Sequence, residues 1–112
     1  MLPRKYRLVG QRRFKLIAER GGAFFLKEMG LKCLKNNLVN SRFAFIISIQ
    51  VDKKAVVRNK IKRRLRQIIY QEIKKIKPGF DVLILTRPAI KNLTFEELRE
   101  RLGQLLRRST LL

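Results

Sequence analysis

Apolar residues recur along this chain first with the period of a helix, then of strands, then of helices again. Between residues 10 and 20, Phe14, Ile17 and Ala18 stand at positions i, i+3 and i+4, the spacing of one helix face. Gly21 and Gly22 follow as a stop signal. The pattern therefore predicts a short first helix.

Three later segments have the composition of β-strands. Residues 23–33 mix apolar and charged side chains and predict one strand or two short ones. Gly30 is expected to mark a bulge or a close approach of two backbones. Asparagines make residues 35–41 a turn. Residues 42–51 are β-branched and aromatic, which predicts a buried strand. Residues 80–87 are an apolar run before Pro88 and predict a central strand.

Two further helices flank that last strand. The first is expected over residues 53–77, preceded by Asp52, which can cap it or offset its positive terminus, and ended by Pro78 and Gly79. In the second, Thr94 and Glu97 match a capping box. Its predicted buried stripe consists of Phe95, Leu98, Leu102, Leu105 and Leu106. The element order α, β strands, α, β, α predicts an α+β or α/β sandwich with helices against one sheet.

Length and charge narrow the class of protein. The 112 residues suit a single domain spanning 1–112, and 46% of them are apolar, enough for a real core. Lys and Arg number 28 against 8 Asp and Glu, a net charge of +20 that points to a polyanion partner. The start resembles no secretory signal, and the longest apolar stretches are too short to span a bilayer. We expect a cytoplasmic nucleic-acid-binding protein with no membrane partner.

The basic segment at residues 58–66 holds six cations in nine positions, four arginines and two lysines. At about 100° per residue, Val57, Ile61 and Leu65 fall within roughly 80° of one another and form a core side. Most of the cations fall outside that sector, and no acid occurs between Asp52 and Glu72. Like charges at i, i+4 destabilise a helix, so the pattern favours an outside polyanion, with arginine suited to phosphate.

This helix has two other interpretations. A membrane-surface helix would need its apolar face exposed, but here that face is required by the core. The arginines could also cover apolar surface with their stems.

Residues for protein-borne catalysis are missing from the sequence. Hydrolysis of nucleic acid by a protein alone needs a general acid and base, or carboxylates holding magnesium. The chain has no histidine, and its single cysteine, Cys33, has no partner for a disulfide or a zinc site. The acids Glu96, Glu97 and Glu100 are explained by helix capping and by pairing with Arg101. We expect no catalytic residues in this chain and assign no metal ligands.

Three stretches together resemble one known family. "KKAVVRNKIKRRLRQ" (residues 53–67) resembles the Arg-Asn-Arg helix signature of the protein subunit of bacterial ribonuclease P. "LPRKYRLVGQRRFKLI" (2–17) is similar to the family opening, with Arg7, Leu8 and Phe14 in place. "FDVLILTRPAIKNLTFEELRERLGQLLRR" (80–108) is similar to its last strand, Arg-Pro turn and final helix. The resemblance covers nearly the whole chain.

The resemblance implies an αβββαβα sandwich in which a mixed four-stranded sheet packs with three helices. It also implies a left-handed βαβ crossover, as in the second domain of ribosomal protein S5, which is an exception to the usual handedness. It further implies a ribonucleoprotein endoribonuclease that removes the 5′ leader of precursor tRNA. In that family a magnesium-dependent RNA subunit carries the chemistry, and the protein binds that RNA and the leader. DNA is not an expected partner.

Site residues follow from the resemblance position by position. The residues expected to contact the catalytic RNA are Lys53, Lys54, Arg58, Asn59, Lys60, Lys62, Arg63, Arg64 and Arg66. The residues expected to contact the leader, in a cleft between the first helix and the sheet, are Arg7, Arg12, Phe14 and Lys32. Phe14 is equally compatible with a place in the core.

The sequence also departs from the family pattern. Lys60 replaces a second arginine, Ala18 stands where a second aromatic is common, and Lys32 falls near a usual strand tyrosine. Ile49 and Gln50 replace two cations, so the register of residues 49–52 is not assigned. Two other classes share some of these features: a structural ribosomal RNA-binding protein, and a helix-turn-helix DNA binder, against which the apolar strands argue.

Overall fold

The computed structural model describes residues 2–112 and has the element order αβββαβα, as the resemblance implied. The helices are α1 (Gln11–Arg20), α2 (Ala55–Glu72) and α3 (Phe95–Arg108). The strands are β1 (Gly22–Phe25), β2 (Met29–Lys35), β3 (Arg42–Ile46) and β4 (Phe80–Thr86). Two short 3₁₀ helices, η1 (Arg4–Tyr6) and η2 (Pro88–Asn92), complete the fold.

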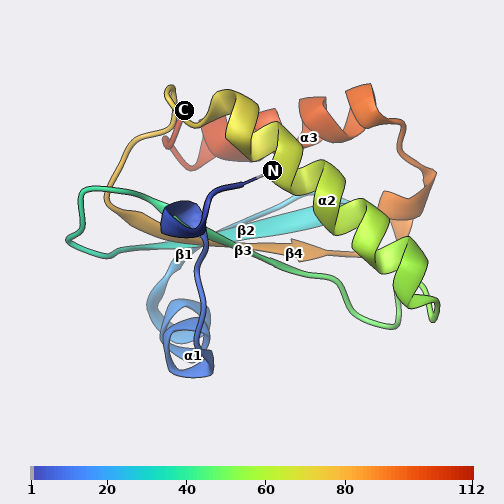
Figure 1. Cartoon of the computed structure of the whole chain (residues 1–112), viewed down its shortest axis with the longest axis horizontal. Coiled ribbons are helices and arrows are strands. Elements are labelled where there is room, and N and C mark those ends of the chain that lie inside the picture. The colour runs from blue at the N-terminus through green and yellow to red at the C-terminus, as the bar shows by residue number, and fades with distance from the viewer. Residues whose placement is uncertain (1) are drawn as a thin grey trace.

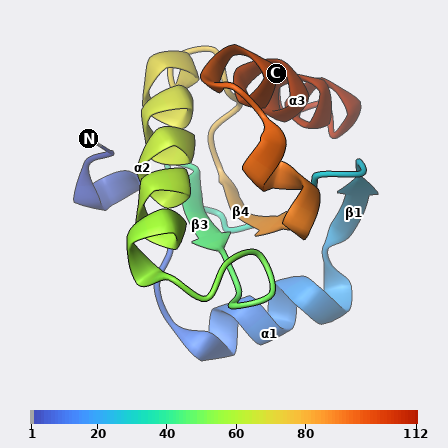
Figure 2. The same ribbon diagram turned by 90° about the vertical axis from the view of Figure 1, so that its right-hand side faces the viewer.

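The four strands form one mixed sheet in the order β1-β2-β4-β3. β4 lies between β2, with which it is antiparallel, and β3, with which it is parallel. The chain leaves β3, returns through α2 above the sheet and enters β4 (Figure 2), and this crossover is left-handed. The predicted exception to the handedness rule is therefore present.

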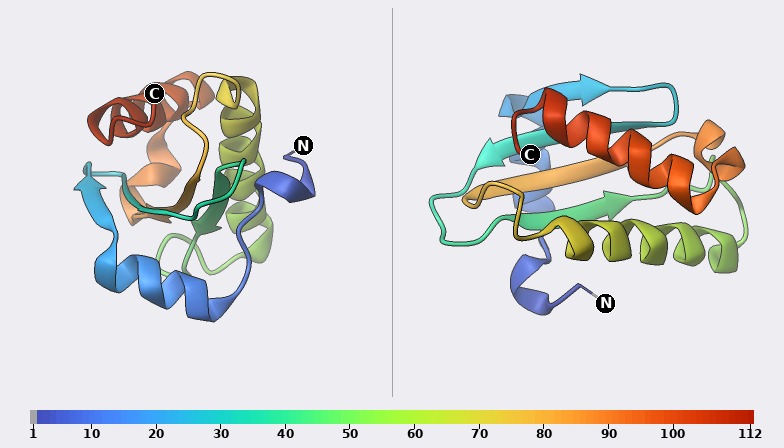
Figure 3. Two further views of the ribbon diagram at one scale, coloured as in Figure 1. Left: turned by 90° about the vertical axis from the view of Figure 1, so that its left-hand side faces the viewer. Right: turned by 90° about the horizontal axis from the view of Figure 1, so that it is seen from above.

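Helices cover the two faces of the sheet unequally (Figure 1). α2 and α3 lie side by side over one face, as the view from above shows (Figure 3), and the main core fills the space between them and the sheet. α1 lies alone on the other face, over a small core of Leu8, Ile17, Ala44 and Leu83. Each fully buried Leu or Ile contributes about 1.5–3 kcal/mol, so most hydrophobic stabilisation is on the α2/α3 side.

Local sequence patterns correctly predicted the start of α3 and the pair of strands β1 and β2. The Thr94 hydroxyl accepts the Glu97 N–H and the Glu97 carboxylate accepts the Thr94 N–H, so the predicted capping box begins α3. Residues 23–33 form two strands, and Gly30 faces Phe25 across them. The Phe25 ring lies over Gly30, where a Cβ would force it to shift, and the pairing of the two strands is regular, with no bulge.

Three predictions about element boundaries were wrong. α2 spans 55–72 rather than 53–77, because the Asp52 carboxylate accepts the Lys54 N–H in a turn before the helix instead of capping it. At the other end, the chain tightens into turns after Glu72. β3 ends at Ile46 rather than at residue 51, because Ser48 turns the chain. Ala18 is exposed, since only the Ile17 side of α1 reaches the sheet.

Candidate nucleic-acid interface

Helix α2 has an apolar side that faces the core and an opposite, cationic side that faces outward. Ile61, Leu65, Ile68 and Ile69 of this helix are at most 8% exposed and face the core. The opposite side carries a shallow groove, which we call the outer groove. It is lined by Val56, Asn59, Lys62, Arg63, Arg66 and Gln67. The helical period thus separates core and cationic sides as the sequence predicted.

The cations of the outer groove have no acidic partners within residues 2–112. The ion pairs found there use other cations, namely Arg13, Arg42, Lys75, Lys91, Arg99 and Arg101. Adjacent unpaired cations repel one another, and an external anion that binds there relieves this cost.

The other predicted RNA contacts on this helix lie around the outer groove rather than in it. Arg58 donates from Nη1 to the carbonyl oxygens of Asp52 and Lys53, at 2.9 and 2.8 Å, and so fixes the chain entering α2. Lys53 and Lys54 are exposed just before the helix. Lys60 and Arg64 line a separate hollow beside η2 and the start of α3.

Arg7 does not line the outer groove, but its charge acts on Arg66 there. Its Nε donates to the carbonyl of Leu2 at 2.8 Å, and residue 7 forms an isolated bridge with Phe43 at the free edge of β3. Partial burial lowers the pKa of Arg66, and the charge of Arg7 lowers it further. Arginine guanidinium groups are well suited to bind phosphate.

The remaining predicted leader contacts belong to the α1 side of the sheet. Phe14 is half-buried against the small core under α1. Lys32 donates from Nζ to the carbonyl of Ala18 at 3.3 Å, and Arg12 is exposed on α1. The structure therefore brings Phe14 and Lys32 to one side of the sheet, and it places Arg7 with Arg66.

On the α1 face of the sheet, one row of residues has two accessible ends, and the sequence prediction missed it. The pairing register aligns Phe25, Gly30, Leu85 and Ile46 across all four strands. Phe25 is 42% and Ile46 37% exposed. The Arg87 guanidinium lies 5.1 Å from the centre of the Phe25 ring. This sheet row combines apolar surface with a cation beside α1.

Asp81 is a second feature that the sequence prediction missed. Its carboxylate is fully buried and accepts two hydrogen bonds from Arg42 at 2.8 Å, one from Asn36 at 2.9 Å and one from Arg13 of α1. Burial alone would raise the pKa of Asp81, but the hydrogen bonds from Arg42, Asn36 and Arg13 hold it below its usual value. We call these four residues the Asp81 cluster; it ties α1 to the sheet.

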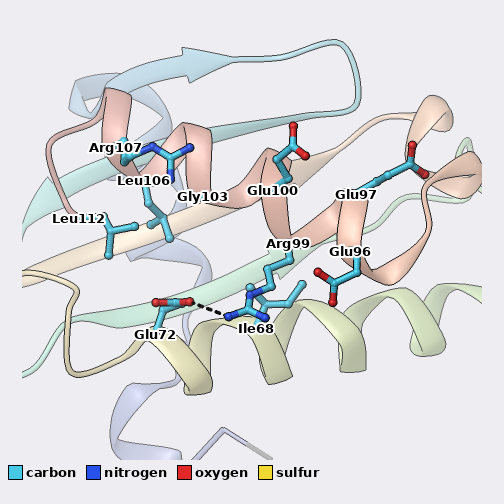
Figure 4. A pocket seen from close by; sticks show the side chains of 10 residues that line it. All are labelled: Ile68, Glu72, Glu96, Glu97, Arg99, Glu100, Gly103, Leu106, Arg107 and Leu112. Atoms are coloured by element: carbon cyan, nitrogen blue, oxygen red, sulfur yellow. Dashed lines mark hydrogen bonds and ion pairs between the residues drawn. The ribbon is translucent and has the colours of Figure 1, made fainter.

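The groove between α2 and α3 has the opposite character to the outer groove (Figure 4). Four of the eight acids of the chain, Glu72, Glu96, Glu97 and Glu100, line it. Glu72 pairs with Arg99 across the groove at 3.5 Å, and Glu97 serves the capping box of α3. These acids lie on the α3 side of α2, and none lines the outer groove.

Among residues 2–112, no three His, Cys, Asp or Glu side chains gather in a way that could hold a metal ion. Burial raises the pKa of the Cys33 thiol, so it stays protonated at neutral pH. Within the same part of the chain, each helix is too short or too polar to cross a membrane.

Comparison with known proteins agrees with this geometry. The Ribonuclease P family model matches residues 2–110. The ribonuclease P protein component of Synechocystis is 33% identical over 105 residues, covering 93% of this chain and 85% of that protein. The ribonuclease P protein of Thermotoga maritima superposes with a TM-score of 0.84 at 30% identity, over 91% of this chain and 96% of that one. The Staphylococcus aureus protein, at 22% identity, shares the fold with a TM-score of 0.88 over 95% and 96% of the two chains.

Proposed function

This chain belongs to the ribonuclease P protein family, and on that premise we propose that it binds a catalytic RNA and the 5′ leader of precursor tRNA. As a ribonuclease P protein component it takes part in tRNA processing, within a ribonucleoprotein that has ribonuclease activity. The family match favours this role over that of a structural ribosomal protein. The observation that carries the proposal is the acid-free outer groove of α2.

The catalytic RNA binds along α2. Asn59, Lys62, Arg63 and Arg66 line the outer groove without acids, and a chain of RNA phosphates would neutralise its cations. Lys53 and Lys54 extend the positive surface before the helix, and Lys60 and Arg64 extend it toward η2. Arg58 orders the entry to α2 through its carbonyl contacts and offers its remaining donors to the RNA.

The leader of precursor tRNA lies between α1 and the sheet row of Phe25, Gly30, Leu85 and Ile46. Single strands bind to cationic surfaces that also carry aromatic side chains, on which bases stack without regard to sequence. Phe25 supplies an exposed ring here, and Arg87 a cation. Phe14, Lys32 and Arg12 border the same face.

The RNA subunit carries the chemistry of leader removal. Ribonuclease P depends on magnesium, and the side chains of residues 2–112 form no cluster that fits a metal ion. We assign the magnesium ions to the RNA, where phosphate oxygens are their natural ligands. The protein binds and orients the two RNAs and lowers the repulsion between them. It acts as one domain over residues 1–112, in the cytoplasm.

Reconstitution tests this function. Mixed with a catalytic RNA of the family, the protein should lower the magnesium concentration needed to cleave the leader from precursor tRNA. The rate is measured with end-labelled substrate across a magnesium titration, and RNA alone is the control. Equal rates with and without protein at low magnesium would exclude the proposed role.

A further inference from the structure

The outer face of α2 continues beyond Arg66 to an aromatic pocket between α2 and the N-terminal segment. At about 100° per residue, Tyr70 lies within about 40° of both Arg63 and Arg66 around the helix, so it shares their face. The side chain of Tyr70 is 47% exposed. The N-terminal segment with η1 lies along this side of α2, away from α3 (Figure 2).

Between the two segments lies an open hollow of about 420 Å³, which we call the tyrosine pocket. Tyr6 and Lys5 line it from η1, and Tyr70, Gln71 and Lys74 from α2 and the turn after it. Lys5 places its ammonium group 5.1 Å from the centre of the Tyr6 ring. Among the described residues that line the pocket, none is acidic, and its volume is in the usual range for small-ligand sites.

Phosphate-binding groups lie next to this pocket. Arg66 is one helical turn before Tyr70, and Arg7 directly follows Tyr6 in the chain. The Nε of Arg7 donates to the carbonyl of Leu2, which holds this side chain along the N-terminal segment that borders the pocket, and Arg66 lines the adjoining outer groove. A nucleotide with its base at the tyrosines would therefore find two arginines for its phosphate.

We propose that Tyr6 and Tyr70 form a binding pocket for one unpaired RNA base, with Arg7 and Arg66 holding the adjacent phosphate. Tyrosine rings stack on any base, and Gln71 offers a donor and an acceptor to its edge. This inference rests on the proposed function, because the base belongs to an RNA bound along the outer groove. The base comes from the catalytic RNA or from precursor tRNA, and the chemistry of the pocket is the same for both.

Tyr6 and Tyr70 also provide a direct readout. The chain contains only these two tyrosines and no tryptophan, so all of its tyrosine fluorescence originates in the pocket. A stacked base quenches tyrosine, and the fluorescence lifetime is insensitive to absorbance by the RNA. We expect the lifetime of the full chain to shorten on saturation with the catalytic RNA alone or with precursor tRNA alone, and the arm that shortens it identifies the source. Tyr6→Phe and Tyr70→Phe assign the signal to each ring.

Affinity measurements separate stacking from charge. Tyr70→Ala should weaken binding to the responding RNA about tenfold, while Tyr70→Phe, which retains a ring, stays within about twofold of wild type. Tyr70→Ala should leave the dependence of affinity on salt unchanged, whereas Arg66→Gln should reduce the log–log slope by about one.

The results of these experiments distinguish a failure of the pocket proposal from a failure of the proposed function on which it rests. If RNA binds and Arg63→Ala weakens it, but the tyrosine lifetimes do not change and Tyr70→Ala binds like wild type, the pocket is empty and only this inference is wrong. If neither RNA binds the full chain, the proposed function itself fails. Circular dichroism of Tyr70→Ala, compared with Tyr70→Phe, excludes unfolding as the cause of lost affinity.

Discussion

Arginines serve two different purposes in two regions of this molecule. In the Asp81 cluster, Arg13 and Arg42 surround a fully buried carboxylate and join α1, β3 and β4. In the outer groove of α2, Arg63 and Arg66 line the surface with no acidic partner among the described residues. The same side chain is internally satisfied in one place and left for an external anion in the other.

The difference shows how a chain with a charge of +20 can both fold and bind. Acids are scarce, so each one placed inside the fold is unavailable to the surface. One acid stabilises the α1 junction, and four line the groove between α2 and α3 (Figure 4). The remaining cations repel one another until a polyanion binds, which links folding stability to RNA binding.

The largest effect is expected from Asp81→Ala. Removing the carboxylate leaves Arg13 and Arg42 facing each other without their acceptor, and should lower the free energy of unfolding by about 3 kcal/mol. Urea denaturation measures the loss. The control is Asp52→Ala, which breaks the solvent-screened pair with Lys91 and should lower stability far less. Equal losses for both variants would remove the distinction between the two regions.

Arg63→Ala should have a smaller effect, and on binding rather than on folding. Loss of one charge-assisted phosphate contact should weaken affinity for the catalytic RNA about tenfold and reduce the log–log salt slope by about one. Stability should not fall, because Arg63 has no ion pair within residues 2–112. The matched control is Arg99→Ala, which removes the same charge from the α2–α3 groove, where Glu72 is its partner. A slope change as large for Arg99→Ala would mean that net charge alone governs binding.

The smallest effect is a dependence of stability on pH. Because the folded pKa of Asp81 is lowered, this group contributes stability above its unfolded pKa, near 4, and the contribution is lost as pH falls through the folded value. The contribution of Asp81 should fall by on the order of 0.3 kcal/mol between pH 7 and pH 4, and more steeply below. The contribution of Asp81 is isolated by comparing the free energy of unfolding of wild type and Asp81→Asn at acidic pH. Identical pH profiles would contradict the assigned role.

Sequence patterns predicted the elements that depend on near neighbours. The capping box at Thr94, the stripe of α3 and the two-sided character of α2 are set by residues three or four apart, so they could be read directly. The resemblance supplied the left-handed crossover, which no local pattern encodes. The ends of β3 and α2 were misplaced, because turns at Ser48 and after Glu72 compete with regular structure through single hydrogen bonds.

Features formed by distant residues could not be predicted. Asp81 stands in an apolar run and gives no sign of its partners, which lie 39 to 68 residues away in the chain. The grouping of Arg7 with Arg66, and of Tyr6 with Tyr70, likewise depends on how the N-terminal segment crosses the sheet edge toward α2. The sequence predicted that Arg7 contacts the leader and that Arg66 contacts the catalytic RNA, and gave no sign that the two residues act on each other.

The strand order has a consequence for synthesis on the ribosome. β4 fills the position between β2 and β3, and β3 has no other strand neighbour. The β1–β2 hairpin can form early, but β3, bridged by Arg7 at its outer edge, lacks its neighbouring strand while the whole of α2 is made, until residues 80–86 emerge. A nascent chain of this protein therefore displays its most basic helix before its sheet is complete. The complete sheet can form only when synthesis is nearly over.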